Sequence, residues 1–159
     1  MDFSAEIKIK KAEASDAKII HEIIKEAFRK YVVDAGITVK IDALEETVED
    51  ITGDIKSKEV FIAFFGDIPA GTVRVEIKPD NTAFITRFGV IPGYQNNGIG
   101  KALIKHVDKL LVSKGIKKAY LYTASRYREL IRFYYNLGFY VDSTTKDKGY
   151  TRALMVKEY

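Results

Sequence analysis

Hydrophobic and polar side chains follow two different periods along the first third of the chain. The segment EIKIKKA (residues 6–12) alternates apolar and polar positions, which is typical of a strand with one buried face. Residues 15–31 instead repeat apolar side chains every three or four positions, behind Ser15 or Asp16 as a helix cap. This stripe consists of Ile19, Ile20, Ile23, Ile24, Ala27, Phe28 and Tyr31. The pattern predicts a strand that leads into an amphipathic helix.

A second helix is predicted to begin at Asp42, because Asp42 and Glu45 have the spacing of a capping box. Apolar side chains then recur at helical intervals as far as Ile55, although Gly53 weakens this helix. Three apolar runs follow, and turn residues separate them. The runs cover 59–65, 70–78 and 82–91. Their lengths and short connections predict an antiparallel meander of three strands.

The last third of the chain alternates helical and strand-like segments. A helix is predicted to begin near Gly98, with a buried stripe of Ile99, Leu103, Val107, Leu110 and Leu111. A strand over 118–123, a helix over 126–138 and two closing strands complete the pattern. Leading helices, a meander and a later alternation of strand and helix predict an α/β fold around a sheet of mixed direction.

The length and composition of the chain indicate a single globular domain. Its 159 residues, 47% of them hydrophobic, suffice for a single core, so we expect one domain over residues 1–159. The chain has no cysteine, which excludes disulfides, thiolate metal sites and a cysteine nucleophile, and we expect no metal. No secretory signal is recognisable, and no apolar run reaches the roughly 18 residues of a membrane span. We therefore expect a soluble, cytoplasmic protein without a membrane partner.

The charge is modest and gives little direction. The 26 Lys and Arg against 22 Asp and Glu leave a net charge of +4, scattered along the chain. The densest basic cluster, ASRYRELIR, falls on a predicted helix and not in a basic stripe with interleaved aromatics. Nucleic-acid binding is disfavoured, and a basic RNA-binding domain is kept as a further alternative.

The segment VIPGYQNNGIGKAL, from Val90 to Leu103, runs from a predicted strand into a predicted helix. The first turn of a helix has unpaired N–H groups and the positive end of the helix dipole, so it can bind phosphate oxygens. Without a Cβ at Gly98 and Gly100, the backbone can approach a bulky anion. Neutral donors are added by Gln95, Asn96 and Asn97. The segment predicts a cradle for a diphosphate, although a plain strand-to-helix turn would have the same composition.

Two better-known phosphate-binding loops do not match. In a P-loop a hydroxyl residue follows the lysine, whereas Ala102 follows Lys101, and Gly93 lies too far upstream of Gly100. A Rossmann site requires G-x-G-x-x-G and an acidic residue at the end of the next strand, and residues 118–123 offer none. Both sites are therefore rejected.

The glycine segment resembles the GNAT (GCN5-related) N-acetyltransferase family. QNNGIG matches the family signature Q/R-x-x-G-x-G/A, VIPGY precedes it, and FYYNLGF downstream matches Y-x-x-x-G-F. The specific residues fall between Thr82 and Phe139, while the order of elements is similar over the whole chain. The resemblance implies a mixed, mainly antiparallel sheet of about seven strands, splayed at the fourth and fifth and flanked by about four helices. It also implies acetyl-CoA as cosubstrate.

The resemblance further implies where the coenzyme binds. The pyrophosphate would lie on the backbone of residues 95–101, and the pantetheine arm would pair with the strand beside Phe88 to Val90. The implied contacts are Phe88, Gly89, Val90, Gln95, Asn96, Asn97, Gly98, Ile99, Gly100, Lys101 and Tyr134. An asparagine that many relatives carry seven residues before the tyrosine is replaced by Tyr127, so one coenzyme contact is left open.

Acetyl transfer to an amine needs a polarised carbonyl and a proton for the departing thiolate, and no covalent enzyme intermediate. We expect the backbone N–H of Val90 to act as oxyanion donor. Tyr134, four residues before Gly138, matches the family's general acid, while helical spacing would equally suit a core tyrosine. Tyr135 points about 100° away around the helix and is the natural control.

The general base is the least determined part of this site. Glu76, on the polar face of TVRVEIK, could act through water, but it could equally be a solvated residue paired with Arg74 or Lys78. Many enzymes of this family need no dedicated base, so none is required here. Glu76 is therefore a candidate base with a structural alternative.

Together these features predict an acetyl-CoA-dependent N-acetyltransferase that transfers the acetyl group directly to a primary amine in a ternary complex. The acceptor is a small-molecule or protein amine that the sequence does not specify, and a homodimer is left open. A non-catalytic module that binds CoA or acetyl-CoA is the principal alternative.

Overall fold

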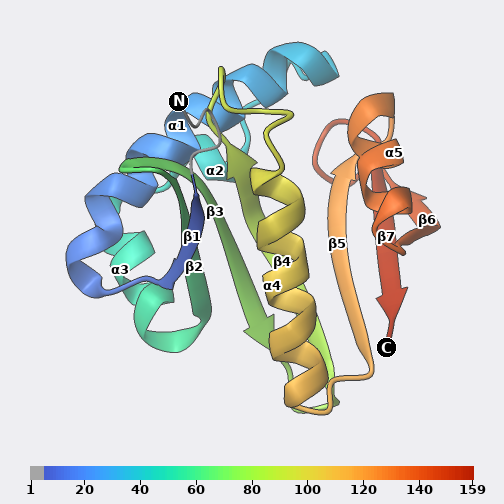
Figure 1. Cartoon of the computed structure of the whole chain (residues 1–159). Coiled ribbons are helices and arrows are strands. Elements are labelled where there is room, and N and C mark those ends of the chain that lie inside the picture. Colours follow the sequence, from blue (N-terminus) through green and yellow to red (C-terminus); the bar gives the residue numbers. More distant parts are fainter. Residues whose placement is uncertain (1–5) are drawn as a thin grey trace.

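A seven-stranded sheet in the order β1-β2-β3-β4-β5-β7-β6 lies at the centre of the computed structural model, which describes residues 6–159 (Figure 1). The strands are β1 (Ile7–Lys11), β2 (Glu59–Phe65), β3 (Ile68–Ile77), β4 (Thr82–Val90), β5 (Lys118–Ala124), β6 (Tyr140–Thr145) and β7 (Arg152–Glu158). Neighbouring strands are antiparallel, except that β4 and β5 are parallel. The mixed, mainly antiparallel sheet predicted from the sequence is confirmed.

Helices cover both faces of this sheet. They are α1 (Ala17–Ala35), α2 (Asp42–Glu45), α3 (Val48–Ser57), α4 (Ile99–Ser113) and α5 (Arg128–Asn136), and a short 3-10 helix (Ala14–Asp16) precedes α1. Side chains of α1 and α3 share one buried cluster with alternate residues of β2, whereas α4 and α5 belong to a second cluster. Among residues 6–159, no helix is long and apolar enough to cross a membrane.

The helix predicted to begin at Asp42 is divided into two, which corrects the sequence-based prediction. Asp42 makes no capping hydrogen bond, and the chain is extended at Glu46 (φ −71°, ψ 137°). A true capping box follows, in which Thr47 Oγ1 accepts from Asp50 N at 3.1 Å and Asp50 Oδ2 accepts from Thr47 N at 3.0 Å. The break turns the Glu46 side chain toward the sheet, where it pairs with Arg74.

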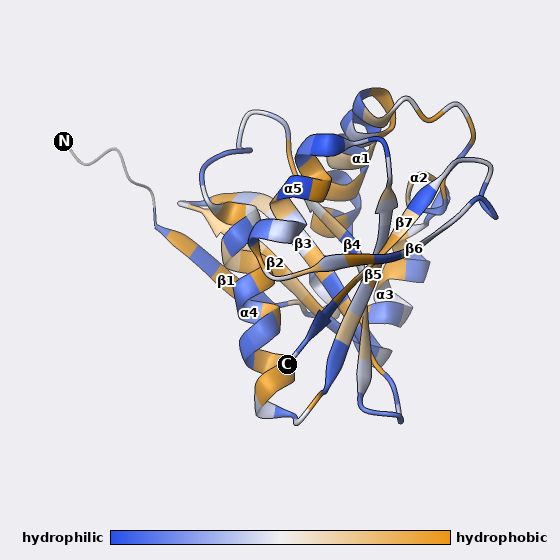
Figure 2. Cartoon of the chain, turned by 90° about the vertical axis from the view of Figure 1, so that its right-hand side faces the viewer, coloured by the Kyte–Doolittle hydropathy of each residue, from blue (hydrophilic) through white to orange (hydrophobic). Residues whose placement is uncertain are grey.

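The predicted apolar stripe of α4 is largely confirmed. Ile99, Leu103, Val107 and Leu111 are buried, while Leu110 is only partly buried and Ile104 takes its place in the core. Figure 2 shows hydrophobic and hydrophilic segments alternating along α4, as expected for a helix with one buried side. Gly71 permits this contact, because an added Cβ would lie 3.0 Å from Leu103 Cδ1.

The sheet opens between β4 and β5, as the family resemblance implied. The two strands pair over three positions, Thr82↔Lys118, Ala83↔Ala119 and Phe84↔Tyr120, and then diverge (Figure 1). A bulge on the other edge of β4 accompanies the divergence. Thr72 pairs with Gly89 and Arg74 with Thr86, so two residues of β4 face one of β3. The first of these two, Arg87, has φ +52°.

Candidate active site

The separation of β4 and β5 opens a cleft of about 940 Å³. Residues 84–90 of β4 form one wall, and Leu121, Tyr122 and Thr123 of β5 form the other. The glycine loop, the start of α4, the segment before α2, helices α1, α2, α3 and α5, the turn between β6 and β7, and Arg152 of β7 complete the lining. The cleft therefore brings together segments that are far apart in the sequence.

The glycine loop presents free backbone donors to one part of this cleft. Gly98 caps α4 with φ +83°, and the first hydrogen bond of the helix runs from Ala102 N to Gly98 O at 2.9 Å. Within the described part of the chain, the N–H groups of residues 95–101 make no backbone hydrogen bond. A Cβ at Gly98 would enter open space, with Ile7 Cδ1 nearest at 3.9 Å. These features fit a diphosphate cradle.

The predicted loop residues do not all face the cleft. Gln95, Asn96, Gly98, Gly100 and Lys101 line it, whereas Asn97 does not and the side chain of Ile99 is buried in the core. The Gln95 amide donates to Val90 O at 3.4 Å, so this side chain also holds the loop to β4. Ile99 could therefore contact a ligand only through its backbone.

Gly100 has a second role that the sequence did not reveal. An added Cβ would lie 3.0 Å from Phe88 Cζ and 3.3 Å from Phe133 Cζ. The two rings are stacked with centroids 5.7 Å apart. A side chain at Gly98 would therefore affect only the approach to the loop, whereas a side chain at Gly100 would disturb the core as well as the loop.

The open edge of β4 carries the backbone group expected to act as oxyanion donor. Ile91 N donates to Ala70 O of the neighbouring β3 segment at 2.8 Å. Successive N–H groups of a strand point to opposite edges, so the Val90 N–H points away from β3. Phe88, Gly89 and Val90 all line the cleft, and Gly89 also packs on α1, where its Cβ would meet Ala27 Cβ at 2.9 Å.

Tyr134 is both a core residue and a cleft residue. It is 4% exposed, and its ring packs against Phe88, Phe133 and Phe139 at centroid distances of 6.0, 5.4 and 5.6 Å. The same residue lines the cleft, and its hydroxyl makes no hydrogen bond within residues 6–159. Burial raises the pKa of Tyr134, so its hydroxyl stays protonated. Tyr135, in contrast, is 51% exposed.

Tyr127, which replaces the family asparagine, is engaged with α1. Its hydroxyl donates to Asp34 Oδ2 at 3.1 Å, and its ring stacks on Tyr31 at 6.0 Å. Burial and the Asp34 hydrogen bond raise the pKa of Tyr127 to about 12. The ring lines the cleft, but the hydroxyl ties the start of α5 to α1.

Glu76 lies apart from these groups. Its carboxylate pairs with Lys78 Nζ at 3.1 Å and Lys58 Nζ at 4.0 Å, and it is not among the residues that line the cleft. This arrangement matches the solvated, ion-paired alternative considered for Glu76. A cluster of three or more acidic, His or Cys side chains able to hold a metal is not found among residues 6–159.

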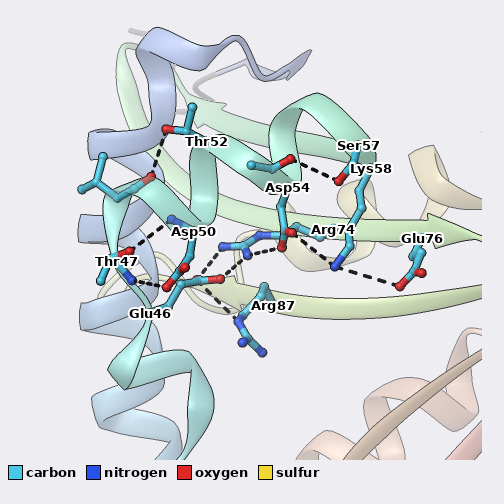
Figure 3. A network of polar contacts seen from close by, with 12 residues as sticks. Glu46, Thr47, Asp50, Thr52, Asp54, Ser57, Lys58, Arg74, Glu76 and Arg87 are labelled. Carbon is cyan, nitrogen blue, oxygen red and sulfur yellow. Dashed lines mark hydrogen bonds and ion pairs between the residues drawn. The ribbon is translucent and has the colours of Figure 1, made fainter.

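A buried charge network beside β4 was not predicted (Figure 3). Arg74 is 1% exposed; its Nη2 donates to Glu46 Oε2 at 2.7 Å and its Nη1 to Asp54 Oδ2 at 2.9 Å. Arg87 Nε lies 3.5 Å from the same Glu46 carboxylate. The partners are 28 and 20 residues from Arg74 in sequence, so no local pattern could have joined them.

Comparison with known proteins identifies the family to which this geometry belongs. A family model described as Acetyltransferase (GNAT) family matches residues 18–139. The chain belongs to the GNAT acetyltransferase family. This membership confirms the predicted family and fold, and with them acetyl-CoA as the acetyl donor that GNAT enzymes use.

Individual GNAT relatives are distant in sequence. A spermidine N(1)-acetyltransferase from Thermoplasma acidophilum is 24% identical over 147 residues, which cover 87% of this chain and 91% of the relative. The structure of a PaiA N-acetyltransferase from the same organism, in complex with coenzyme A, has a TM-score of 0.84 at 24% identity and covers 97% and 99% of the two chains. The ribosomal-protein-S18-alanine N-acetyltransferase of Escherichia coli has a TM-score of 0.77 at 18% identity, covering 96% and 94%.

Proposed function

We propose that this GNAT protein is a single-domain enzyme that transfers the acetyl group of acetyl-CoA to a primary amine in a ternary complex. The proposal rests on one observation: the start of α4 and the opening between β4 and β5 border the same cleft. Residues at the start of α4, whose N–H groups make no backbone hydrogen bond among residues 6–159, line the same cleft that opens where β4 leaves β5. A diphosphate and an extended pantetheine arm need these two features side by side.

Different residues of the cleft would bind the diphosphate and the pantetheine arm of the coenzyme. The backbone of residues 95–101 would hold the diphosphate, with Lys101 as an additional cation. The open edge of β4 at Phe88, Gly89 and Val90 would pair with the amides of the pantetheine arm. Acetyl-CoA supplies the acetyl group as a thioester, and the remaining steps depend on the protein and the amine.

In the proposed step the neutral amine attacks the carbonyl carbon, the C–N bond forms and the C–S bond breaks. The Val90 N–H would donate to the carbonyl oxygen as negative charge develops on it. Tyr134 would give its hydroxyl proton to the departing sulfur, the amine would lose a proton to solvent, and the tyrosinate would then regain a proton from solvent. Burial raises the pKa of Tyr134, so the hydroxyl keeps its proton until the thiolate departs.

Glu76 is left out of this mechanism because it lies outside the cleft and is paired with lysines. Without a dedicated base, the amine must lose its proton before it binds. The rate is then expected to rise with pH toward the pKa of the amine.

The identities of the relatives do not decide the acceptor. One relative is named for spermidine and another for an alanine of ribosomal protein S18, at 24% and 18% identity. A polyamine and a protein amine are therefore both candidates by comparison alone. The charges of this cleft are more specific.

The proposed function is tested by calorimetric titration with CoA and acetyl-CoA, followed by a screen of amines for release of free thiol. We expect both coenzymes to bind and at least one class of primary amine to accelerate thiol release. Binding without thiol release for any amine would favour the non-catalytic CoA-binding module. Failure of both coenzymes to bind would reject the enzyme and the module alike.

A further inference from the structure

The cleft as a whole carries a small surplus of positive charge. Six basic and four acidic residues line the whole cleft. Three of the acidic residues already have cationic partners, at 2.9 Å for Asp54 with Arg74, 3.0 Å for Asp147 with Arg152 and 3.8 Å for Asp42 with Lys148. The fourth, Glu129, lies in the first turn of α5. A polycationic acceptor would have to displace cations that are already in place.

Arg87 is one of the cations that this arrangement leaves over; Lys40 and Lys101 also line the cleft and have no ion pair among residues 6–159. Glu46 is bound through both oxygens by Arg74, whose guanidinium is itself buried. Arg87 therefore reaches Glu46 only through Nε, at 3.5 Å, and Nε forms no hydrogen bond. Within residues 6–159 its two terminal nitrogens have no ion-pair or hydrogen-bond partner. Figure 3 shows these nitrogens turned away from the network.

The backbone at Arg87 is shaped to direct this side chain. Arg87 has φ +52°, a left-handed conformation that is uncommon for residues other than glycine, and it lies in the bulge of β4. The bulge inserts one extra residue into β4 and so changes the direction of the Arg87 side chain. This side chain is 25% exposed and lines the cleft. Two residues further on, the same strand carries Gly89 and then Val90, the proposed oxyanion donor. The guanidinium thus belongs to the wall along which the acceptor must approach.

We propose that Arg87 binds an anionic group of the acceptor, so that the acceptor is a primary amine that also carries a carboxylate or phosphate and is not a polyamine. The inference rests on the proposed function and specifies its substrate class. A planar guanidinium whose two terminal nitrogens have no partner among residues 6–159 matches two oxygens of such an anion.

The first test measures kcat/KM by thiol release with acceptors that differ in one group. Free α-amino acids are compared with their amides, ethanolamine phosphate with ethanolamine, and spermidine serves as the polycation. The wild type is expected to prefer one anionic series by roughly 10- to 100-fold over its neutral partners, the worth of a charge-assisted hydrogen bond. The preferred series tells carboxylate from phosphate.

Arg87→Gln should remove this preference by raising KM for the anionic acceptor while leaving the neutral partner unchanged. Arg87→Lys should retain part of it, because the charge remains and the bidentate geometry is lost. Lys78→Gln is the matched control, since it removes one positive charge from β3–β4 outside the cleft. It should leave the preference intact.

Two outcomes would overturn the inference: faster turnover of spermidine than of any anionic amine, or an equal effect of Arg87→Gln on acids and amides. A second series needs no turnover. The melting temperature of the CoA-saturated protein is measured with N-acetyl amino acids, with their amides, and with N-acetylethanolamine phosphate. Stabilisation by none of the anionic products, or equal stabilisation in Arg87→Gln, would also reject it. Failure of the proposed function is separate, because it appears as absent coenzyme binding or as no thiol release with any amine.

Discussion

At the scale of single residues, Tyr134 shows how a side chain can serve packing and chemistry together. Its ring fills a space between three phenylalanines, while the residue borders the cleft. Sequence periodicity alone could not separate a core tyrosine from an acid, and the structure shows that the two descriptions are compatible. Only the hydroxyl distinguishes them.

Tyr134→Phe is predicted to reduce turnover by roughly 10²- to 10⁴-fold at saturating acetyl-CoA, because it deletes the proton donor and keeps the ring. CoA affinity and melting temperature should hold, since the hydroxyl has no hydrogen-bond partner among the described residues. Steady-state thiol release and calorimetry measure the two effects. Tyr135→Phe, on the exposed side of α5, should do little. A loss of less than threefold for Tyr134→Phe would reject the acid role.

Arg74 marks where residue-level prediction from the sequence ended. Its position in TVRVEIK suggested a polar strand residue that could pair with Glu76, yet it is buried and bound to Glu46 and Asp54. Alternation assigns a side chain to a face of the sheet, but it does not tell whether a charged face is open to water. Whether Arg74 is exposed depends on how α3 and the residues before it pack on the sheet, and the local sequence does not determine that packing.

At the scale of elements, the loop from β4 to α4 was the most predictable part of the site. Its glycines and asparagines indicated a turn into a helix, and Asn96 and Gly98 indeed have φ of +68° and +83°. The division between α2 and α3 was missed, although Thr47 and Asp50 form a capping box. Two overlapping capping signals cannot both begin one helix, and the burial of Glu46 beside Arg74 favours the second.

Gly98→Asn is predicted to weaken CoA binding by roughly 10- to 100-fold, because its side chain would occupy the space in which the N–H groups meet the diphosphate. Asparagine tolerates a left-handed backbone, so stability should change little. Calorimetry with CoA measures the effect. Gly115→Asn is the matched control, with φ +70°, open surroundings and a place at the far end of α4. Equal CoA affinities in both variants would contradict the cradle.

The Arg74–Glu46 pair is predicted to hold the α2–α3 segment against β3. Arg74→Met should lower the free energy of unfolding by about 3–5 kcal/mol, because it leaves the buried Glu46 carboxylate without its main partner. Adding Glu46→Leu should restore much of that loss, since no buried charge is then left unpaired. Urea denaturation provides the comparison. A double variant no more stable than Arg74→Met would show that the pair is not the cause.

At the scale of the whole molecule, several tyrosines link stability to alkaline pH. Burial raises the pKa of Tyr127 and Tyr150 to about 12, from an ordinary value of 10.0, and it also raises the pKa of Tyr134 and Tyr159. The folded state therefore holds these protons more tightly than the unfolded state. The resulting stabilisation is complete below pH 10 and is lost as pH rises through the folded values.

The free energy of unfolding is accordingly predicted to fall between about pH 10 and pH 12. Combining Tyr127→Phe and Tyr150→Phe should make this fall shallower, because two of the groups responsible are removed. Urea denaturation at several pH values measures the slope. Tyr135→Phe removes an exposed hydroxyl and should not change it. An unchanged slope in the double variant would exclude these tyrosines as the cause.

The overall architecture could be predicted because the sequence patterns that indicate it are either local periodicities or motifs of the GNAT family. Strand and helix periods gave the alternation of elements, and the resemblance carried by QNNGIG and FYYNLGF supplied the sheet and its opening. The charge network and the direction of Arg87 could not be predicted, since they depend on a bulge and on contacts between distant segments.

The placement of the binding groups also bears on how the reaction would end. In the proposed complex the cradle at α4 and the edge of β4 hold the diphosphate and the pantetheine arm, and neither part changes when the acetyl group leaves. Interactions that are equal before and after the reaction lower KM without favouring release of product. Free CoA would then compete with acetyl-CoA at nearly equal affinity, so the ratio of the two in the surrounding solution, more than their total amount, would set the rate of the enzyme.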